Sequence, residues 1–506
     1  MRGSSRGRDF GIVRSISSRS VLRGLAAALA FAAIEVATAA TPALGAFPFT
    51  YPLLSTPANG ALAGYAITGD QRDAHLVAFS SDATNVVRGV ASGHFSIFVI
   101  HRAAPFNDAG QPWVPGGVSA PVRGLGGAAP NGDAILPSVG GDFYNNGDCV
   151  AFISTATNLV RGVSSGRPEA YLENLRSRRV MIVSVSSHGA PANGPVDSVS
   201  VDGQCARVAF TSTATNLTSG APREVRSAAA PGGIDEVYVH IFSARGFPAG
   251  VASGFPALAE NRGRVGKTFL VSANAAGHPA DGNCSHAVIA SFGLNVAYSC
   301  DSSNLAAHTG GESNVYTTQL SRGFGSAHAR PIGVLRRATS LVSETPSRRA
   351  GNGPSDHPAI NADGSIVVYH TTSSNLGAPT AVGSVIRADV TRSPAAQLWV
   401  SRPFDGLTLP NGPSDDPSID FDGGLLMFDS SASNIGEPGP SNVDNNNASD
   451  IFLWGANDRL VKLRSLPCDA ECHPLSGASS HPVTSWVINY TLFTHDGQLW
   501  MRFIGK

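Results

Sequence analysis

The sequence has little charge and few aromatic residues for its length: 14% of its 506 residues are charged and 7% are aromatic. Beyond the N-terminus it has no apolar run long enough to cross a bilayer as a helix. It also has no basic cluster there of the kind that binds nucleic acid, and its 14 histidines form no His-Glu-x-x-His motif. These absences argue against a nucleic-acid-binding protein, a membrane-spanning mature chain and a common metalloprotease.

The basic and apolar residues that the rest of the chain lacks are found at the N-terminus. Six arginines precede the apolar run Leu25–Ile34 and the small residues Ala37-Thr38-Ala39, which is typical of a secretory signal peptide. We expect cleavage after residue 39 or as late as residue 46. Removing six arginines, Asp9 and Glu35 from the 36 basic and 37 acidic residues leaves 30 and 35, a net charge of −5. The pattern predicts a periplasmic or secreted bacterial protein.

What the chain does have is a repeat of the form Asn-Gly-Pro-Ser-Asp-x-Pro-Ser-Ile, in stricter or looser copies. Seven copies begin at Asn59, Asn131, Asn193, Gly277, Asn352, Asn411 and Ser476, spaced 59 to 84 residues apart. Asn-Gly and Pro favour a turn through a positive φ and a fixed φ, respectively. Self-similarity at this period indicates a propeller or solenoid, whose units bury their apolar faces against one another.

Each copy is followed by the same series of short strands. After the motif strand and a second turn such as Asp363-Gly364 comes a strand of the Val-Ala-Phe-Ser type, for example Val208-Ala209-Phe210-Thr211, which we expect to be half-buried. A Thr/Ser-Asn-aliphatic turn such as Thr215-Asn216-Leu217 follows, and then a third strand and often a fourth. Four strands per unit make a propeller blade. The fold class is therefore all-β, with residues 47–506 forming a single β-propeller domain.

The two ends of the repeat region indicate how the ring closes. The last unit stops after three strands at Phe503, whereas Tyr51–Ser55 resembles the fourth strands that precede the other motifs. Pairing this N-terminal strand with the last unit would remove an open sheet edge. We expect seven four-stranded blades closed by the N-terminal strand, with six blades as the alternative if one unit forms something else.

The six cysteines suit an oxidising compartment, where disulfides form. We expect Cys468 to pair with Cys472 and Cys284 to pair with Cys300, because each pair lies close together in the sequence. Cys149 and Cys205 fall in neighbouring units, where we expect the sheets to be too far apart for a bridge.

The candidate ligand site is the acid at the fifth position of the motif: Asp197, Asp281, Asp356 and Asp415. These residues come from consecutive units and precede the strand that lines the centre of a propeller, so they could form an acidic arc that binds a cation, calcium in particular. The alternative is that each aspartate only caps its own turn. We expect His357 and His481, which precede a motif proline, to be turn residues.

The strand pair Asp-Gly-x-x-Val-Ala-Phe-x-Ser resembles the WD40-like repeat of bacterial TolB-like propellers (PD40-type), across almost the whole of residues 47–506. The resemblance implies a propeller fold and an exported protein. It does not imply a role in the Tol system, because TolB has an α/β domain before its propeller. Peptidases with this repeat carry a hydrolase domain for which the repeats leave no room here.

No catalytic residues stand out in the sequence. Gly162-Val163-Ser164-Ser165-Gly166 has the form of a nucleophile elbow, but it falls in a loop between strands and lacks the strand-to-helix turn that an elbow requires. We therefore expect an interaction module and not an enzyme. We expect it to be a monomer that binds a protein, peptide or glycan. The alternatives are an enzyme with its site at the centre of the ring and a cation-binding structural component of the envelope.

Overall fold

The computed structural model of the protein describes residues 50–68, 74–88, 90, 93–103, 115–142, 145–218, 233–242, 266–307, 309, 311–320, 338–379, 381–437, 444, 446–457, 459–464, 476–485 and 490–503. All of them belong to one compact unit, Ala46–Lys506. The expected signal peptide and the Cys468–Cys472 pair lie outside these ranges. Within them, no helix is long and apolar enough to cross a membrane.

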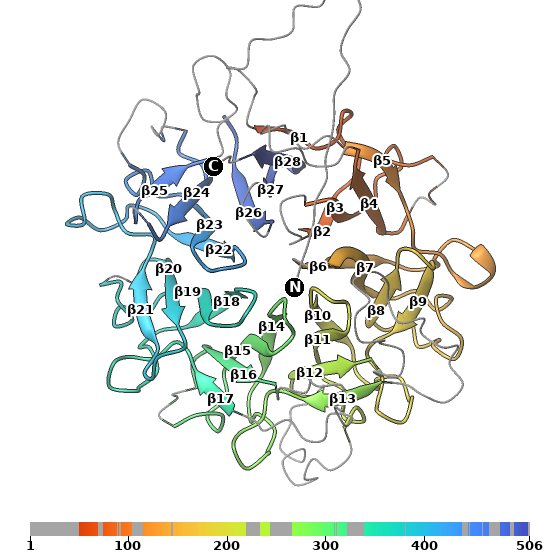
Figure 1. Ribbon diagram of the computed structural model, residues 1–506, viewed down its shortest axis with the longest axis horizontal. Helices are drawn as coiled ribbons and strands as arrows, with labels where there is room; N and C mark the ends of the chain where they lie inside the picture. The colour runs from red at the N-terminus through yellow and green to blue at the C-terminus, as the bar shows by residue number, and fades with distance from the viewer. Residues whose placement is uncertain are drawn as a thin grey trace, which may run out of the picture. The chain divides into compact units, whose positions relative to one another are not determined.

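The described strands form seven antiparallel sheets of four strands each, arranged around a common centre (Figure 1). We number the sheets as blades 1 to 7 in the order of their innermost strands. The innermost strands are β2 (Leu62–Ile67), β6 (Ala134–Asp142), β10 (Val196–Val201), β14 (Cys284–Ile289), β18 (Ser355–Ile360), β22 (Ser414–Ile419) and β26 (Ser479–Thr484). The second strands are β3 (Leu76–Ser81), β7 (Asn145–Ser154), β11 (Arg207–Ser212), β15 (Asn295–Cys300), β19 (Ile366–Thr371), β23 (Leu425–Ser430) and β27 (Tyr490–His495).

The outer strands complete each blade. The third strands are β4 (Ser96–Arg102), β8 (Glu169–Asn174), β12 (Glu236–Ile241), β16 (Asn314–Gln319), β20 (Ser384–Asp389), β24 (Asp450–Gly455) and β28 (Gln498–Phe503). The fourth strands are β5 (Pro115–Ser119), β9 (Arg179–Ile182), β13 (Lys267–Leu270), β17 (Ala338–Leu341), β21 (Ala396–Trp399), β25 (Val461–Leu463) and, in blade 7, β1 (Thr50–Pro52). A short 3-10 turn, η1 (Leu125–Gly127), connects blades 1 and 2.

The ring closes as the sequence predicts. Strand β1 pairs antiparallel with β28, with Thr50 opposite Arg502 and Pro52 opposite Trp500. The backbone N–H of Leu53 extends the pairing by donating to the carbonyl of Leu499 at 2.9 Å. Each innermost strand contacts the next one around the ring, and β26 contacts β2. Seven blades closed by the N-terminal strand are confirmed, which excludes the six-blade alternative.

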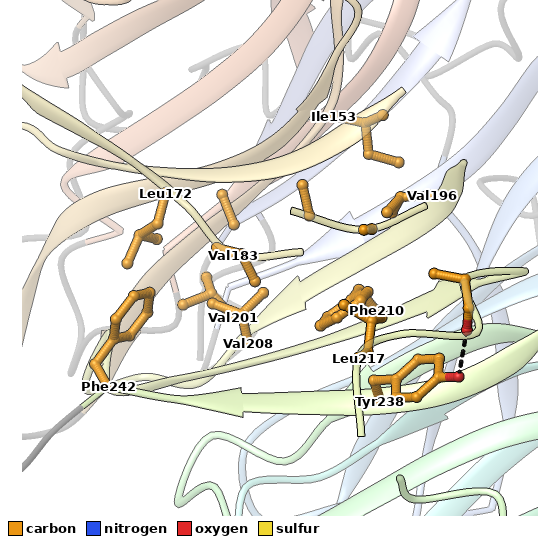
Figure 2. Close-up of a cluster of buried hydrophobic side chains, with 14 of the residues drawn as sticks. Ile153, Leu172, Val183, Val196, Val201, Val208, Phe210, Leu217, Tyr238 and Phe242 are labelled. Carbon is orange, nitrogen blue, oxygen red and sulfur yellow. Dashed lines mark hydrogen bonds between the residues drawn. The ribbon is translucent and has the colours of Figure 1, made fainter. Parts of the chain in front are cut away.

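Among the described residues, the buried hydrophobic side chains form seven clusters, and each cluster lies between two neighbouring blades. Figure 2 shows the cluster between blades 2 and 3, in which Leu172 and Val183 of blade 2 face Val208 and Phe210 of blade 3. The hydroxyl of Tyr238 in this cluster donates to the carbonyl of Ala214 at 2.8 Å. Because every cluster needs two blades, no blade buries its apolar surface alone.

The second strand of each blade is buried on both faces, so the expectation of a half-buried strand was wrong. In β11, Val208 and Phe210 pack toward blade 2, whereas Ala209 packs toward blade 4. All six residues of β11 are buried. The alternation in the sequence is therefore between large and small side chains, which lets one sheet fit between two others.

A repeated set of hydrogen bonds explains why the motif begins with asparagine. In blade 1, the Asn59 amide donates to Thr84 Oγ1 at 3.0 Å and its Oδ1 accepts from the Thr84 N–H at 2.8 Å. The Asn59 N–H donates to Asn85 Oδ1 at 3.0 Å. These three bonds recur in blades 2, 3, 5 and 6 at the equivalent residues. We call this set the asparagine clip, and it ties the motif to the Thr/Ser-Asn element.

The motif glycine is needed because the backbone of a neighbouring turn lies close to it, and not because it has a positive φ. This corrects the expectation from the sequence. Gly132 has no positive φ, and a Cβ atom on it would lie 2.7 Å from the backbone nitrogen of Ala156. Gly194 is in the same position relative to Ala214, at 2.6 Å. A side chain here would separate the motif from the turn that the asparagine clip holds.

Two disulfides are present among the described residues. Cys284 and Cys300 are bridged across β14 and β15, as expected. Cys149 is bridged to Cys205, with a Cα–Cα distance of 6.2 Å, and this bridge joins blades 2 and 3 against expectation. The turn that carries Cys205 reaches toward β7, and Gly140 leaves room for it, because a Cβ atom there would lie 2.6 Å from Cys149 Sγ.

Candidate functional site

Every innermost strand contains a β-bulge close to its start. In six blades the residue after the fifth motif position has a positive φ, and these bulge residues are Gly64, Leu136, His286, His357, Asp416 and His481. Blade 3 has Ser198 at this position without a positive φ. A positive φ is unfavourable for residues other than glycine, and bulges of this kind often direct a side chain into a site. His357 and His481 are thus strand residues, not turn residues.

The bulge residues make contacts that pass from blade to blade around the centre. The rings of His286 and His357 are in edge contact, with centroids 4.3 Å apart. His481 accepts a hydrogen bond at its carbonyl from the Tyr65 hydroxyl of blade 1. On the far side, Leu136 lies against Gly64 and is 42% exposed. Blades 4 to 7 therefore contribute histidine and aspartate, whereas blades 1 and 2 contribute apolar residues.

His357 is at the centre of the polar part. Its Nδ1 lies 3.1 Å from Asp415 Oδ1 of the next blade and 3.8 Å from Asp356 Oδ1. Behind it, His370 Nδ1 of β19 lies 2.7 Å from Asp356 Oδ1. The side chains of His357, Asp356 and Asp415 are 35%, 35% and 42% exposed, so the cluster is open on one side.

A second part of the cluster lies between blades 6 and 7. His481 Nε2 lies 3.1 Å from Asp416 Oδ2, and the His481 N–H donates to Asp429 Oδ2 at 3.2 Å. Asp429 lies opposite Asp415 in the pairing of β22 with β23 and is 7% exposed. We call Asp356, His357, His370, Asp415, Asp416, Asp429 and His481 the central cluster.

The carboxylates of the central cluster lie close together and change the pKa values of their neighbours. The hydrogen bond to Asp415 raises the pKa of His357 to about 9, with further help from the charges of Asp356 and Asp416. Burial raises the pKa of Asp429 to about 7, and the charge of Asp416 adds to the effect. At neutral pH a proton on His357 thus offsets part of the negative charge, which is what a bound cation would do in its place.

The side chains are close enough to bind a metal ion. Three groups have ligand atoms within 4.8 Å of one another: Asp356 with His357 and His370, His357 with Asp415 and Asp416, and Asp416 with Asp429 and His481. Calcium prefers oxygen ligands alone, whereas imidazole with carboxylate suits zinc, manganese or iron. The donor set therefore favours a divalent transition metal over the calcium ion expected from the aspartates.

Of the four aspartates singled out from the sequence, the structure brings two together. Asp356 and Asp415 both contact His357. Asp197 lies in blade 3, where the bulge residue is Ser198 and no ligating residue of the central cluster is nearby among the described residues. The structure thus places two of the four aspartates near each other, in blades 5 and 6, whereas the neighbouring bulge positions of blades 4 and 7 carry histidine.

Asp281 occupies a different position from the other three, because the fourth motif begins at Asp281 and not at Gly277 as the sequence pattern suggested. Its carboxylate accepts from the Ser303 N–H at 2.7 Å, just as Asn352 Oδ1 accepts from the Ser374 N–H at 2.9 Å. Asp281 is thus the clip residue of blade 4, and Ser285 takes the fifth position. Although burial acts in the opposite direction, hydrogen bonds from Ser302, Ser303 and Asn304 lower the pKa of Asp281.

Sequence reasoning missed five members of the central cluster: His357, His370, Asp416, Asp429 and His481. A signal for them was present in the columns of the aligned repeats. The penultimate residue of the second strand is Ser80, Ile153, Thr211, Ser299 or Thr494 in five blades, but His370 and Asp429 in blades 5 and 6. A histidine or an aspartate at a position where the other repeats have a small or apolar residue indicates a residue that is not needed for the repeat fold.

Comparisons with known proteins assign the chain to no family. No family model matches the chain, and no curated protein matches it. Similar solved structures include TolB from Acinetobacter baumannii, at 10% identity over 78% of this chain and 64% of that one, with a TM-score of 0.35. This chain thus spans just under two thirds of the length of that TolB chain.

Two other similar structures are enzymes. An oligogalacturonate lyase in complex with manganese is 10% identical over 90% of this chain and 95% of its own, with a TM-score of 0.46. The acylaminoacyl peptidase of Pyrococcus horikoshii is 11% identical over 88% and 52%, with a TM-score of 0.40. A propeller fold by itself does not define a function, because one fold can host many functions.

Proposed function

We propose that this protein is an exported β-propeller that binds a divalent transition-metal ion at the central cluster and uses it to hold a ligand. The observation that carries the proposal is the position of His357, whose Nδ1 lies within 3.8 Å of carboxylate oxygens from Asp356, Asp415 and Asp416. Imidazole and carboxylate groups converging from two blades form a donor set that zinc, manganese or iron accepts.

The exposure of the central cluster supports a role in ligand binding. An ion held by His357 and Asp415, which are 35% and 42% exposed, can take a further donor atom from a molecule at the centre of the ring. Leu136 on the opposite side offers an exposed apolar contact. A protein segment, a peptide or a glycan with an oxygen donor could bind the ion and also contact Leu136. Such binding agrees with an interaction module.

The proposal is tested by calorimetric titration of the chelator-treated protein with zinc, manganese and calcium. We expect saturable binding of zinc or manganese, weaker binding of calcium and a metal-dependent rise in melting temperature. In His357→Gly, binding should weaken by more than about tenfold. Glycine suits the positive φ at this position and occurs there in blade 1 as Gly64.

His94→Ala is the matched control. His94 Nδ1 also lies 3.3 Å from an aspartate of the next blade, Asp133, but the pair is exposed and outside the central cluster. This variant should bind metal as the parent does. Absence of saturable zinc or manganese binding by the parent, or an equal loss in His94→Ala and His357→Gly, would contradict the proposal.

A further inference from the structure

The two oxygens of the Asp416 carboxylate face histidines from two different blades. Oδ1 lies 3.8 Å from His357 Nδ1 of blade 5, and Oδ2 lies 3.1 Å from His481 Nε2 of blade 7. The side chain is only 23% exposed, and it extends from a bulge residue with a φ of 46°. A carboxylate with its two oxygens directed at separate nitrogen donors is arranged as a bridging ligand and not as a terminal one.

The residues on the two sides of Asp416 form separate ligand groups. Asp356, His357 and His370 make one three-residue group on blade 5, and Asp416, Asp429 and His481 make another across blades 6 and 7. The two groups share no residue, and no group of mutually close ligand atoms contains both His370 and His481. In this arrangement His370 and His481 do not belong to one site, so a single ion would leave one of the two histidines without a metal.

The charge of the central cluster is in line with two ions. It contains four carboxylates, from Asp356, Asp415, Asp416 and Asp429, and two divalent ions would balance their four negative charges. Asp429 is 7% exposed, and a buried charge is costly unless an opposite charge compensates it.

We propose that the central cluster holds two divalent transition-metal ions, bridged by the carboxylate of Asp416. One ion binds Asp356, His357 and His370, and the other binds Asp429 and His481. Paired ions in proteins are about 3.5 to 4 Å apart, a separation that a bridging carboxylate spans. A phosphate or carboxylate group of a ligand can then bind both ions at once. This inference rests on the proposed metal-binding function and adds the number of ions and the bridge.

Manganese is the probe for this inference, because two neighbouring Mn²⁺ ions couple magnetically. The full chain is loaded with Mn²⁺ and desalted, and its metal content and electron paramagnetic resonance spectrum are measured. We expect two ions per chain and a coupled spectrum with narrower hyperfine splitting than that of an isolated ion. His481→Gly and His370→Ala each remove a ligand of one ion only, so each should retain one ion and lose the coupling.

Asp416→Asn tests the bridge itself, and asparagine tolerates the positive φ of this position. We expect it to abolish the coupled spectrum, whereas His94→Ala should preserve both the spectrum and two bound ions. Melting curves without metal show whether each variant is folded. One ion per chain without coupling in the parent protein would overturn the inference and leave the proposed function intact. No bound manganese and no bound zinc would overturn both.

Discussion

The bulge position shows how a repeated backbone can carry different side chains. Glycine, leucine, histidine and aspartate all occupy it with a positive φ, at Gly64, Leu136, His357 and Asp416. The conformation is therefore imposed by the pairing of the first two strands and not by the residue. Since the unfavourable φ of a non-glycine residue costs about 1 to 3 kcal/mol, histidine and aspartate at this position are retained against a local cost, as is common in functional sites.

The first residue of the asparagine clip, unlike the bulge residue, has a structural role. In blade 4 this residue is Asp281. Asp281→Asn restores the residue that the other clips use, so we expect a melting temperature close to that of the parent and unchanged metal binding. Asp281→Ala removes the acceptor for Ser302 and Ser303 and should lower the unfolding free energy by about 1 kcal/mol. Thermal melting and zinc titration of both variants check this. Loss of metal binding in Asp281→Asn would place Asp281 in a ligand site instead.

At this scale the sequence predicted only part of the site. Asp356 and Asp415 could be found because they recur in the motif, whereas Asp281 was misplaced because the fourth copy has Asp-Gly-Asn where the others have Asn-Gly-Pro or a related form. His357 and His481 were assigned to turns because a proline follows each of them. Whether a residue lies in a turn or in a bulge depends on strand register, and register follows from pairing with β19 and β27, which spacing within one motif does not reveal.

The strands were easier to predict than their burial. The Val-Ala-Phe-Ser pattern identified all seven second strands, but it suggested one buried face because alternation usually indicates this. In a propeller both faces of a blade contact neighbours, so even a charged residue can be enclosed. Glu173 in the third strand of blade 2 is fully buried, and neither of its carboxylate oxygens has a hydrogen-bond partner among the residues that the structure describes. Arg178 Nη1, at 4.0 Å, is its nearby countercharge.

Glu173 should make stability depend on pH. Burial raises its pKa to about 7, against an opposing effect of Arg178 and Arg123. The folded state therefore binds a proton on the Glu173 carboxyl group more tightly than the unfolded state does. The stability gained from this proton is complete below about pH 4.5 and is lost as the pH rises to about 7. Glu173→Gln mimics the protonated acid, so we expect it to match the parent at pH 4 and to exceed its unfolding free energy at pH 8 by about 3 kcal/mol.

Urea unfolding of the parent and of Glu173→Gln at both pH values measures this difference. Glu312→Gln serves as the control for the chemical change itself, since Glu312 is an exposed glutamate. The comparison within each pH removes the contribution of the other buried acids, such as Glu169 and Asp420, because these are unchanged. Equal stability of the parent and Glu173→Gln at pH 8 would show that Glu173 is not held protonated.

At the scale of the whole molecule, the packing and the central cluster depend on contacts between blades. Each of the seven hydrophobic clusters joins two blades, and the disulfide between Cys149 and Cys205 covalently links two of them. The central cluster likewise needs side chains from blades 5, 6 and 7. The number of repeats was predictable because the motif recurs in every copy, and closure was predictable because the last unit lacks a fourth strand that the N-terminal segment resembles. The central cluster was not, because it exists only where different copies meet.

The closing strand gives a test of this dependence on the complete ring. Deletion of residues through Ser55 removes β1 and Leu53, which is 1% exposed and packs in the cluster between blades 7 and 1. The third strand of blade 7, β28, then becomes an open edge, so we expect a lower melting temperature and association that increases with concentration. A chain that begins at Ala46 keeps β1 and serves as the reference, and calorimetry with gel filtration measures both effects.

Leu53→Ala separates packing from edge protection. It retains the backbone of β1 and its hydrogen bonds to β28 but removes buried apolar volume, which should cost about 2 to 5 kcal/mol. We therefore expect this variant to melt earlier than the reference and to stay monomeric, whereas the deletion should associate. If the deletion remains monomeric and melts with the reference, β1 does not close the ring. If Leu53→Ala also associates, the loss of packing is sufficient to open the edge, and the hydrogen bonds of β1 are secondary to its buried leucine.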